Sequence, residues 1–284
     1  MNRIKEIHKP SLKLGHAQHQ AGVPILETRS LTVRYDGVLA LEDISLRLNT
    51  GERVAVIGPN GAGKSTLFKV IAGVLPASSG EVKIAGQSPG GHICIAYLPQ
   101  RSQVDWNFPV NVTDVVMMGR IGKLGLLRWP RPRDWELVRQ CLEVVKLTEL
   151  AGRQISELSG GQQQRMFIAR ALAQEAELML MDEPFTGLDV NSQEDILNIL
   201  DDLQQRGVTI MASTHDLNLA GEHFDRVVLI NRRVLGMGLP EQVFTTERLM
   251  QAYGGHLRVI QTEKEILALG DTCCDEEEAH AHTP

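Results

Sequence analysis

The segment Gly58–Thr66 restricts the possible folds of this chain more than any other stretch. It fits the pattern G-x-x-x-x-G-K-[ST], whose fixed positions are Gly58, Gly63, Lys64 and Ser65. The residues before it, Arg53–Ile57, are apolar and β-branched, which predicts a buried strand. The residues after it, Leu67–Ala72, predict a helix that Gly73 ends. A glycine loop between a strand and a helix predicts a phosphate-binding loop in an α/β fold.

The chemistry of this loop suits a nucleotide polyphosphate. Its glycines let successive backbone N–H groups face inward as an anion nest, and the following helix adds the partial positive charge of its N-terminus. Lys64 can reach the β- and γ-phosphates, and the Ser65 hydroxyl can ligate Mg²⁺. We therefore expect the nucleotide to contact Gly58, Pro59, Asn60, Gly61, Ala62, Gly63, Lys64, Ser65 and Thr66. The pattern leaves open which nucleotide binds and what its hydrolysis drives.

Composition narrows the classes of function. The chain has 284 residues, of which 43% are hydrophobic, so it can bury a sizeable core. Its net charge of −6 argues against a nucleic-acid-binding surface over the whole protein. No apolar run is long enough to span a bilayer, and the first residues lack the apolar core of a secretion signal. Four cysteines without a disulfide framework suit a reducing cytosol, so any work at a membrane would need a partner.

Two kinds of segment flank the loop. Short alternating runs predict further strands at Leu31–Tyr35, Ile44–Leu48, Gly80–Ile84 and Ile93–Tyr97. From about 100 to 175 the pattern changes to helices, expected at Thr113–Arg120 and Asp134–Leu147. This region predicts a helical insertion within an α/β core. Tyr35, at the end of its strand, is either a packing residue or a ring that stacks on a nucleotide base.

A second glycine-rich segment begins another predicted helix. Ser159 is placed as an N-cap, and Gly160 and Gly161 leave exposed N–H groups at the start of a helix that runs to Ala173. This arrangement predicts a second anion site. One chain would then carry two phosphate sites.

Leu178–Pro184 predicts a buried strand that ends in two carboxylates. Burying charge is costly unless the charge has a role. Asp182 can hold Mg²⁺, and Glu183 can orient or deprotonate an attacking water. The alternative is a purely structural pair at the end of a strand.

The next predicted strand, Val208–Ser213, brings His215 to its C-terminal end, where open α/β sheets bind their ligands. We favour a γ-phosphate contact for His215 over simple packing. Arg226–Ile230 and Val234–Met237 predict a hairpin, and Pro240–Tyr253 predicts a helix.

The two ends differ from the rest of the chain. Residues 1–24 carry spaced histidines with little periodicity, and residues 259–284 form an acidic segment with Cys273, Cys274, His280 and His282. We interpret both as tails outside a domain at 25–258. Metal binding by either tail is the alternative.

Taken together, these motifs closely resemble the ATP-binding cassette (ABC) ATPases over about residues 25–255. Gly58–Thr66 matches the Walker A loop, Leu158–Gln162 the signature motif, and Leu178–Glu183 Walker B. The remaining matches are Tyr35 to the A-loop aromatic, Gln100 to the Q-loop, Thr186–Asp189 to the D-loop and His215 to the switch histidine. Gly187 departs from the pattern, because many members carry alanine there.

The resemblance implies a P-loop core with an antiparallel β subdomain and a helical subdomain. It also implies ATP and Mg²⁺, with Ser65, Gln100 and Asp182 near the metal and Glu183, Gln100 and His215 in catalysis. Such cassettes form head-to-tail homodimers, in which ATP lies between the Walker A loop of one copy and the signature of the other. Ser159, Gly160, Gly161, Gln162 and Asp189 would then complete the nucleotide site. Integral-membrane permease subunits are the implied further partners, through the helical insertion and the region of Gln100.

Tyr97–Arg120 gives a finer match. It is similar to the cassettes of manganese, zinc and iron importers, which implies a peripheral protein on the cytoplasmic face of the plasma (inner) membrane. An extracytoplasmic metal-binding protein would act through the permease. Manganese is the first choice, and zinc or iron is the alternative. A non-transport ABC ATPase acting on nucleic acid is a second alternative, disfavoured because there is one cassette, no sustained heptad repeat and an acidic balance.

Overall fold

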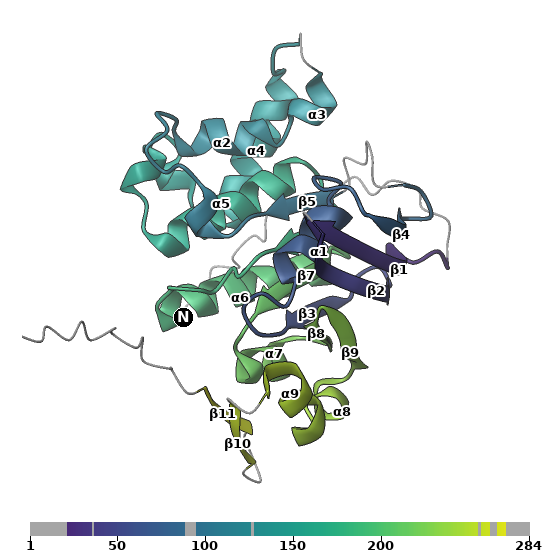
Figure 1. Cartoon of the computed structure of the whole chain (residues 1–284). Helices are drawn as coiled ribbons and strands as arrows, with labels where there is room; N and C mark the ends of the chain where they lie inside the picture. Colours follow the sequence, from purple (N-terminus) through teal and green to yellow (C-terminus); the bar gives the residue numbers. More distant parts are fainter. Residues whose placement is uncertain are drawn as a thin grey trace, which may run out of the picture.

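A six-stranded sheet forms the centre of the protein in a computed structural model (Figure 1). The structure describes residues 22–35, 37–88, 95–125, 128–254, 257–261 and 266–270. The strand order is β5 (Ile95–Leu98), β6 (Leu178–Met181), β7 (Thr209–Thr214), β3 (Arg53–Ile57), β8 (Arg226–Asn231) and β9 (Arg233–Gly238). All neighbours are parallel except β8 and β9, which form the predicted hairpin. The parallel strands therefore end at one common edge.

The central strand β3 is buried on both faces, as its apolar sequence predicts. Val54 and Val56 pack on the side of helix α1 (Lys64–Ile71). Ala55 and Ile57 face the opposite side, toward the core beneath the helical layer. Because both faces are covered, the start and direction of the phosphate loop after Ile57 are fixed by packing.

A separate antiparallel sheet confirms the predicted β subdomain. Its order is β2 (Val38–Leu48), β1 (Leu26–Tyr35) and β4 (Ser79–Ile84). An ion pair between Glu42 on β2 and Arg233 on β9 joins this sheet to the central one. The end of β1 thereby carries Tyr35 to the phosphate loop.

A helical layer lies over one side of the core, at the top of Figure 1. It contains α2 (Val112–Met118), α3 (Ile121–Leu124), α4 (Pro132–Val144) and α5 (Gly160–Ala173), with short 3₁₀ turns η1 (Arg101–Gln103), η2 (Thr148–Leu150) and η3 (Ile155–Glu157). This layer is the expected insertion. The predicted bounds of α4 were wrong at both ends. Proline at the first helical turn starts α4 two residues earlier, and a left-handed backbone at Lys146 (φ 57°) follows its early end.

The remaining helices are α6 (Val190–Gln205), α7 (Leu217–His223), α8 (Pro240–Val243) and α9 (Thr246–Tyr253). Pro240–Tyr253 was expected as one helix, but Thr245 caps a new one by accepting the Arg248 N–H at 3.4 Å. A hairpin of β10 (Leu257–Gln261) and β11 (Ile266–Gly270) then crosses the expected boundary at 258. Most of the two tails, including their histidines and cysteines, lies outside the described residues. Within the described part of the chain, no helix is long and apolar enough to cross a membrane.

Candidate functional site

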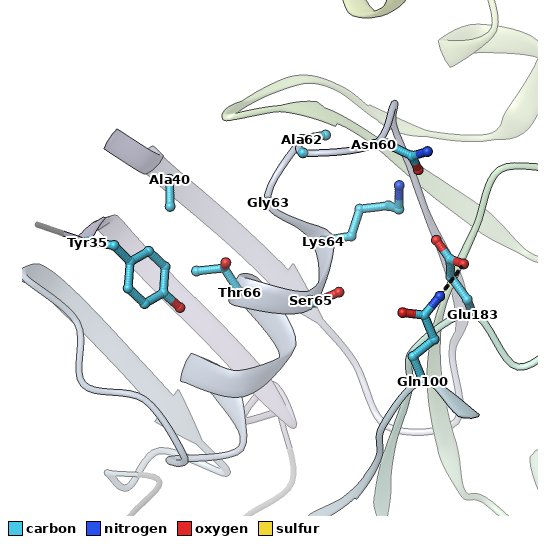
Figure 2. Close-up of a pocket in the computed structure, with 11 residues that line it drawn as sticks. Tyr35, Ala40, Asn60, Ala62, Gly63, Lys64, Ser65, Thr66, Gln100 and Glu183 are labelled. Atoms are coloured by element: carbon cyan, nitrogen blue, oxygen red, sulfur yellow. Dashed lines mark hydrogen bonds between the residues drawn. The ribbon is translucent and has the colours of Figure 1, made fainter. Parts of the chain in front are cut away.

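A cavity of about 530 Å³ opens where strand β3 ends (Figure 2). The loop between β3 and α1 forms its floor, Tyr35 and Ala40 lie at one end, and Gln100 and Glu183 lie at the other. Its lining residues are Tyr35, Ala40, Asn60, Gly61, Ala62, Gly63, Lys64, Ser65, Thr66, Gln100 and Glu183. The C-terminal edge of a parallel sheet is where α/β proteins bind ligands. Ala40 is the one lining residue that sequence analysis did not name.

The loop needs glycine for steric reasons that the structure makes specific. Gly63 has a φ of 98°, and a Cβ there would come within 2.5 Å of Leu41 and 2.8 Å of the Ala40 carbonyl oxygen. A Cβ at Gly58 would overlap the carbonyl oxygen of Ile230. The loop thus fits tightly between β2 and β8, and its backbone N–H groups remain available to a ligand.

Lys64 places a positive charge inside the loop. It begins α1 and is 6% exposed, and its Nζ donates to the carbonyl oxygens of Gly58 (2.7 Å) and Pro59 (3.0 Å). Burial lowers the pKa of Lys64, while the carboxylates of Glu183 and Asp182 act in the opposite direction. The cation is therefore held where a polyphosphate would replace two neutral carbonyl partners with charged ones.

Glu183 and Asp182 follow β6 directly, as predicted. Glu183 Oε2 accepts hydrogen bonds from Gln100 Nε2 at 3.0 Å and from Thr186 Oγ1 at 3.2 Å. The Glu183 backbone is left-handed, with a φ of 49°. A non-glycine residue in that region costs about 1–3 kcal/mol of backbone strain, and it persists there only where its surroundings hold it.

Ser213 at the end of β7 supplies that hold, and sequence analysis missed it. Its hydroxyl accepts the Glu183 N–H at 2.8 Å and donates to Asp182 Oδ1 at 2.8 Å. Tyr97 on β5 approaches the other oxygen of Asp182, at 3.5 Å, and burial followed by the charge of Asp182 raises the pKa of the Tyr97 hydroxyl. Ser213 therefore fixes both carboxylate residues from the neighbouring strand. Only its position directly beside β6 could have identified it.

The oxygen-rich donor set beside the cavity fits Mg²⁺. Asp182 is buried at 3% exposed, and Ser65 and Gln100 lie near Glu183 in Figure 2. Among the described residues, no group of three or more histidine, cysteine or carboxylate side chains forms a metal cage. Mg²⁺ characteristically binds through few protein oxygens plus substrate phosphates, so the residues present are suited to it.

The predicted second anion site lies apart from this cavity. Ser159 caps α5 as expected: its hydroxyl accepts the Gln162 N–H at 3.4 Å, and Gln162 Oε1 accepts the Ser159 N–H at 2.9 Å. Asp189 caps α6 through Ser192, and Ser192 in turn packs against Gly161. Within one chain, the signature and D-loop segments thus touch each other, and neither lines the cavity.

His215 also lies outside the lining residues. It is exposed, immediately after β7. A single copy therefore brings Asn60–Thr66 of the Walker A loop together with Tyr35, Gln100 and Glu183 around the cavity, whereas Gly58 and Pro59 are not among its lining residues and hold Lys64 through their carbonyl oxygens. It does not bring the signature residues, Asp189 or His215 to this cavity.

A glycine loop and buried lysine after β3, with two carboxylates after β6, define a P-loop nucleotide-binding protein. The ABC transporter family matches residues 41–186, which is about half of the chain. The protein belongs to the ABC transporter family, as an ATP-binding cassette that hydrolyses ATP.

Curated relatives extend the similarity over most of the chain. The manganese transport system ATP-binding protein MntB of Bacillus subtilis is 44% identical over 86% of this chain and 98% of its own length. The zinc transport system ATP-binding protein TroB of Treponema pallidum is 46% identical over 85% of this chain and 91% of its own length. The chelated iron transport system membrane protein YfeB of Yersinia pestis is 48% identical over 84% of this chain and 81% of its own length.

Solved structures confirm the expected fold. A cassette of an ABC transporter in its ADP conformation has a TM-score of 0.72, with 27% identity over 82% of this chain and 99% of its own. A dimeric, post-hydrolysis cassette bound to ADP and Pi has a TM-score of 0.67, with 26% identity over 76% of this chain and 98% of its own. Cassettes of this family work as dimers with membrane permease subunits.

Proposed function

We propose that this protein is the ATP-hydrolysing subunit of an importer for a divalent transition-metal ion, with manganese as the first candidate. The observation that carries the proposal is the identity of 44–48% over at least 84% of the chain to the three relatives named for manganese, zinc and iron transport. Manganese comes first because further relatives at 42–46% identity also bear its name. Zinc or iron is the alternative, and it rests on the other two names.

We propose a role for the main groups of the cavity. The loop N–H groups and Lys64 bind the β- and γ-phosphates. Glu183, oriented by Gln100, accepts a proton from the water that attacks the γ-phosphate. Tyr35 is 42% exposed at the far end of the cavity, where its ring can stack on the adenine.

The groups outside the cavity act when a second copy binds. Ser159, Gly160, Gly161 and Gln162 present a helix N-terminus to the γ-phosphate held by the other copy. Asp189 lies at the same interface, beside the signature of its own chain. His215 contacts the γ-phosphate once the two copies close. ATP joins the two copies, and hydrolysis releases them.

Ser65, Asp182 and Gln100 would hold Mg²⁺, which neutralises charge on the phosphate oxygens when bound. Asp182 already has one oxygen fixed by Ser213. The other oxygen accepts a long hydrogen bond of 3.5 Å from the Tyr97 hydroxyl, so it is the better placed to face the metal or its waters.

The helical layer offers a place for the permease. A groove of about 410 Å³ is lined mainly by apolar side chains of α2, α3 and the segment before α4: Met117, Met118, Ile121, Leu124 and Pro130, with Asp114, Gly125 and Arg128. We propose that the permease contacts this groove at the cytoplasmic face of the membrane. A binding protein outside the membrane would deliver the ion to that permease. Ile121→Glu should abolish metal-ion uptake and leave ATP turnover of the purified chain unchanged. Unaffected uptake would exclude the groove as the contact with the permease.

The decisive experiment is metal uptake in cells lacking this protein, with Mn²⁺, Zn²⁺ and Fe²⁺ measured in parallel. Wild type and Glu183→Gln serve as the rescue pair. Loss of uptake of one ion, restored only by wild type, supports both the ion and ATP-driven import. Normal uptake of all three ions refutes the metal assignment and leaves the ATPase assignment standing.

A further inference from the structure

The segment after Gln100 carries the residues by which the chain resembles metal importers. On the sequence they indicate kinship only. In the structure, η1 (Arg101–Gln103) and the residues up to Phe108 are mostly exposed and connect β5 of the central sheet to α2 of the helical layer along the chain. A short exposed segment of this kind is usually free to move. Here it is fastened to α5 at two points.

The first point is a hydrogen bond from Arg101. Its Nε donates to Gln163 Oε1 at 2.6 Å. Gln163 is 4% exposed, and its Nε2 donates to the Ile155 carbonyl oxygen at 3.4 Å, so its orientation is fixed. A charged donor makes this bond stronger than one between neutral groups.

The guanidinium of Arg101 also lies directly against the signature. A Cβ at Gly160 would stand 2.7 Å from Arg101 Nη1 and 3.2 Å from Leu188. A side chain at Gly160 would therefore displace the guanidinium of Arg101 from its present place. The small size of Gly160 allows Arg101, next to Gln100, and Leu188, within the D-loop, to meet over the start of α5.

The second point is Trp106. Its Nε1 donates to the Arg101 carbonyl oxygen at 3.0 Å, and its ring packs edge-to-face on Phe167, with centroids 5.5 Å apart. Phe167 is one helical turn beyond Gln163, so Arg101 and Trp106 hold the same face of α5. We refer to Arg101, Trp106, Gln163 and Phe167 as the Q-loop clamp.

The clamp begins at the residue that follows Gln100. Gln100 Nε2 donates to Glu183, and the Gln100 carbonyl oxygen accepts the Gln103 N–H at 2.9 Å. A shift of Arg101 against α5 would thus move Gln100 relative to Glu183. We propose that Arg101 is a positioning residue that fixes the Glu183–Gln100 pair to the signature helix of the same chain, so that the pair at one ATP site of the dimer moves together with the signature that this chain contributes to the other ATP site. This inference rests on the proposed roles of Glu183 and of the signature.

The test compares Arg101→Met, Gln163→Leu and the double variant in the purified full-length protein with ATP and Mg²⁺. Each single variant should lower kcat about tenfold, the order expected for one lost charge-assisted hydrogen bond. The double variant should also lose about tenfold, because the two side chains form one interaction. The KM for ATP should stay within about twofold, because neither residue lines the cavity.

Arg139→Met is the matched control. Arg139 is an exposed arginine on α4 whose guanidinium binds Glu136, so its loss removes a similar bond far from the clamp. Arg101→Lys keeps the charge but lacks Nε, and it should behave like Arg101→Met. Amide hydrogen exchange without nucleotide should be faster at residues 101–106 in Arg101→Met and unchanged there in Arg139→Met.

The possible outcomes separate this inference from the proposed function. If Arg101→Met turns over ATP at the wild-type rate, as Arg139→Met is expected to do, the clamp is overturned and the ATPase assignment stands. A hundredfold loss in the double variant, or full rescue by lysine, would also overturn it. Slow hydrogen exchange in Arg101→Met would do so even in a protein that did not turn over ATP. Normal uptake of all three ions in cells lacking this protein, together with a tenfold loss of kcat in Arg101→Met, would remove the metal assignment and leave the clamp standing.

Discussion

Ser213→Ala would measure how far the fold itself holds Glu183 in place. Ser213 is fully buried, and its hydroxyl makes two contacts of 2.8 Å, one with the Glu183 N–H and one with Asp182 Oδ1. Alanine removes both without adding volume. The Glu183 N–H then loses its acceptor, and with it the contact from Ser213 that opposes relaxation of the strained left-handed backbone of Glu183 (φ 49°).

The expected magnitude follows from these contacts. A buried N–H without an acceptor costs about 1–3 kcal/mol, and the hydrogen bond to a carboxylate contributes about 1.5–3 kcal/mol. Partial relaxation and a water molecule would recover some of this, so we expect a loss of about 2–3 kcal/mol in the free energy of unfolding. For a domain of this size that corresponds to a decrease in Tm of about 4–12 °C. We expect kcat to fall about 10- to 100-fold, because the strained Glu183 can relax away from its attacking position.

Thr28→Val is the control for Ser213→Ala. Thr28 is 2% exposed, and its hydroxyl donates to the Ile44 carbonyl oxygen (3.0 Å) and accepts the Leu46 N–H (2.9 Å). It is thus a buried hydroxyl with two partners, located in the antiparallel sheet. Both variants should lose stability, but only Ser213→Ala should lose turnover, measured by steady-state ATP hydrolysis and thermal unfolding. If Ser213→Ala keeps kcat within about twofold of Thr28→Val, Ser213 does not position Glu183.

Three further outcomes are expected. Glu183→Gln should keep ATP binding and trap an ATP-bound dimer visible by size-exclusion chromatography; a variant that stays monomeric with ATP would refute the proposed ATP sandwich. Lys64→Ala should lower ATP affinity and turnover by at least about tenfold, because the buried positive charge of Lys64, which is 6% exposed, is lost. An unchanged affinity for a fluorescent ATP analogue, measured by titration, would show that Lys64 does not bind the phosphates. Asp134, paired with Arg120 at 3.1 Å, is buried, which raises its pKa, but hydrogen bonds from the Arg131 N–H and then Arg120 outweigh burial and bring the pKa below the ordinary 3.8. Because this pKa is lowered, the ionised carboxylate of Asp134 stabilises the folded state above pH 3.8, and that stabilisation is lost as the pH falls below 3.8. Asp134→Asn should therefore lower the free energy of unfolding in urea by about 3 kcal/mol at pH 7 and by progressively less in acid. A loss that did not change with pH would contradict this.

Local patterns were sufficient for the central sheet and for much of the cavity. Arg53–Ile57 is a strand with the predicted bounds, because it is buried on both faces and its sequence is correspondingly apolar throughout. In the loop after it, Gly63 adopts a φ of 98°, which glycine tolerates and other residues rarely do. The helix ends were less predictable. The start of α4 depends on the proline in its first turn and on the cap by Asp134, and the start of α9 depends on the cap by Thr245, so local contacts outweigh the apolar period.

The residues that sequence analysis missed share a physical cause. Ser213, Arg101 and Trp106 act through partners that are 30 to 62 positions away in the chain. Nothing in their local sequence distinguishes them from an ordinary strand serine or surface arginine. Glu183 could be identified because a carboxylate at a strand end is costly without a role, whereas a serine there costs nothing and signals nothing. The residues that do the chemistry are therefore visible in the sequence, but those that hold them in place become visible only when the strand order brings β7 beside β6 and α5 beside η1.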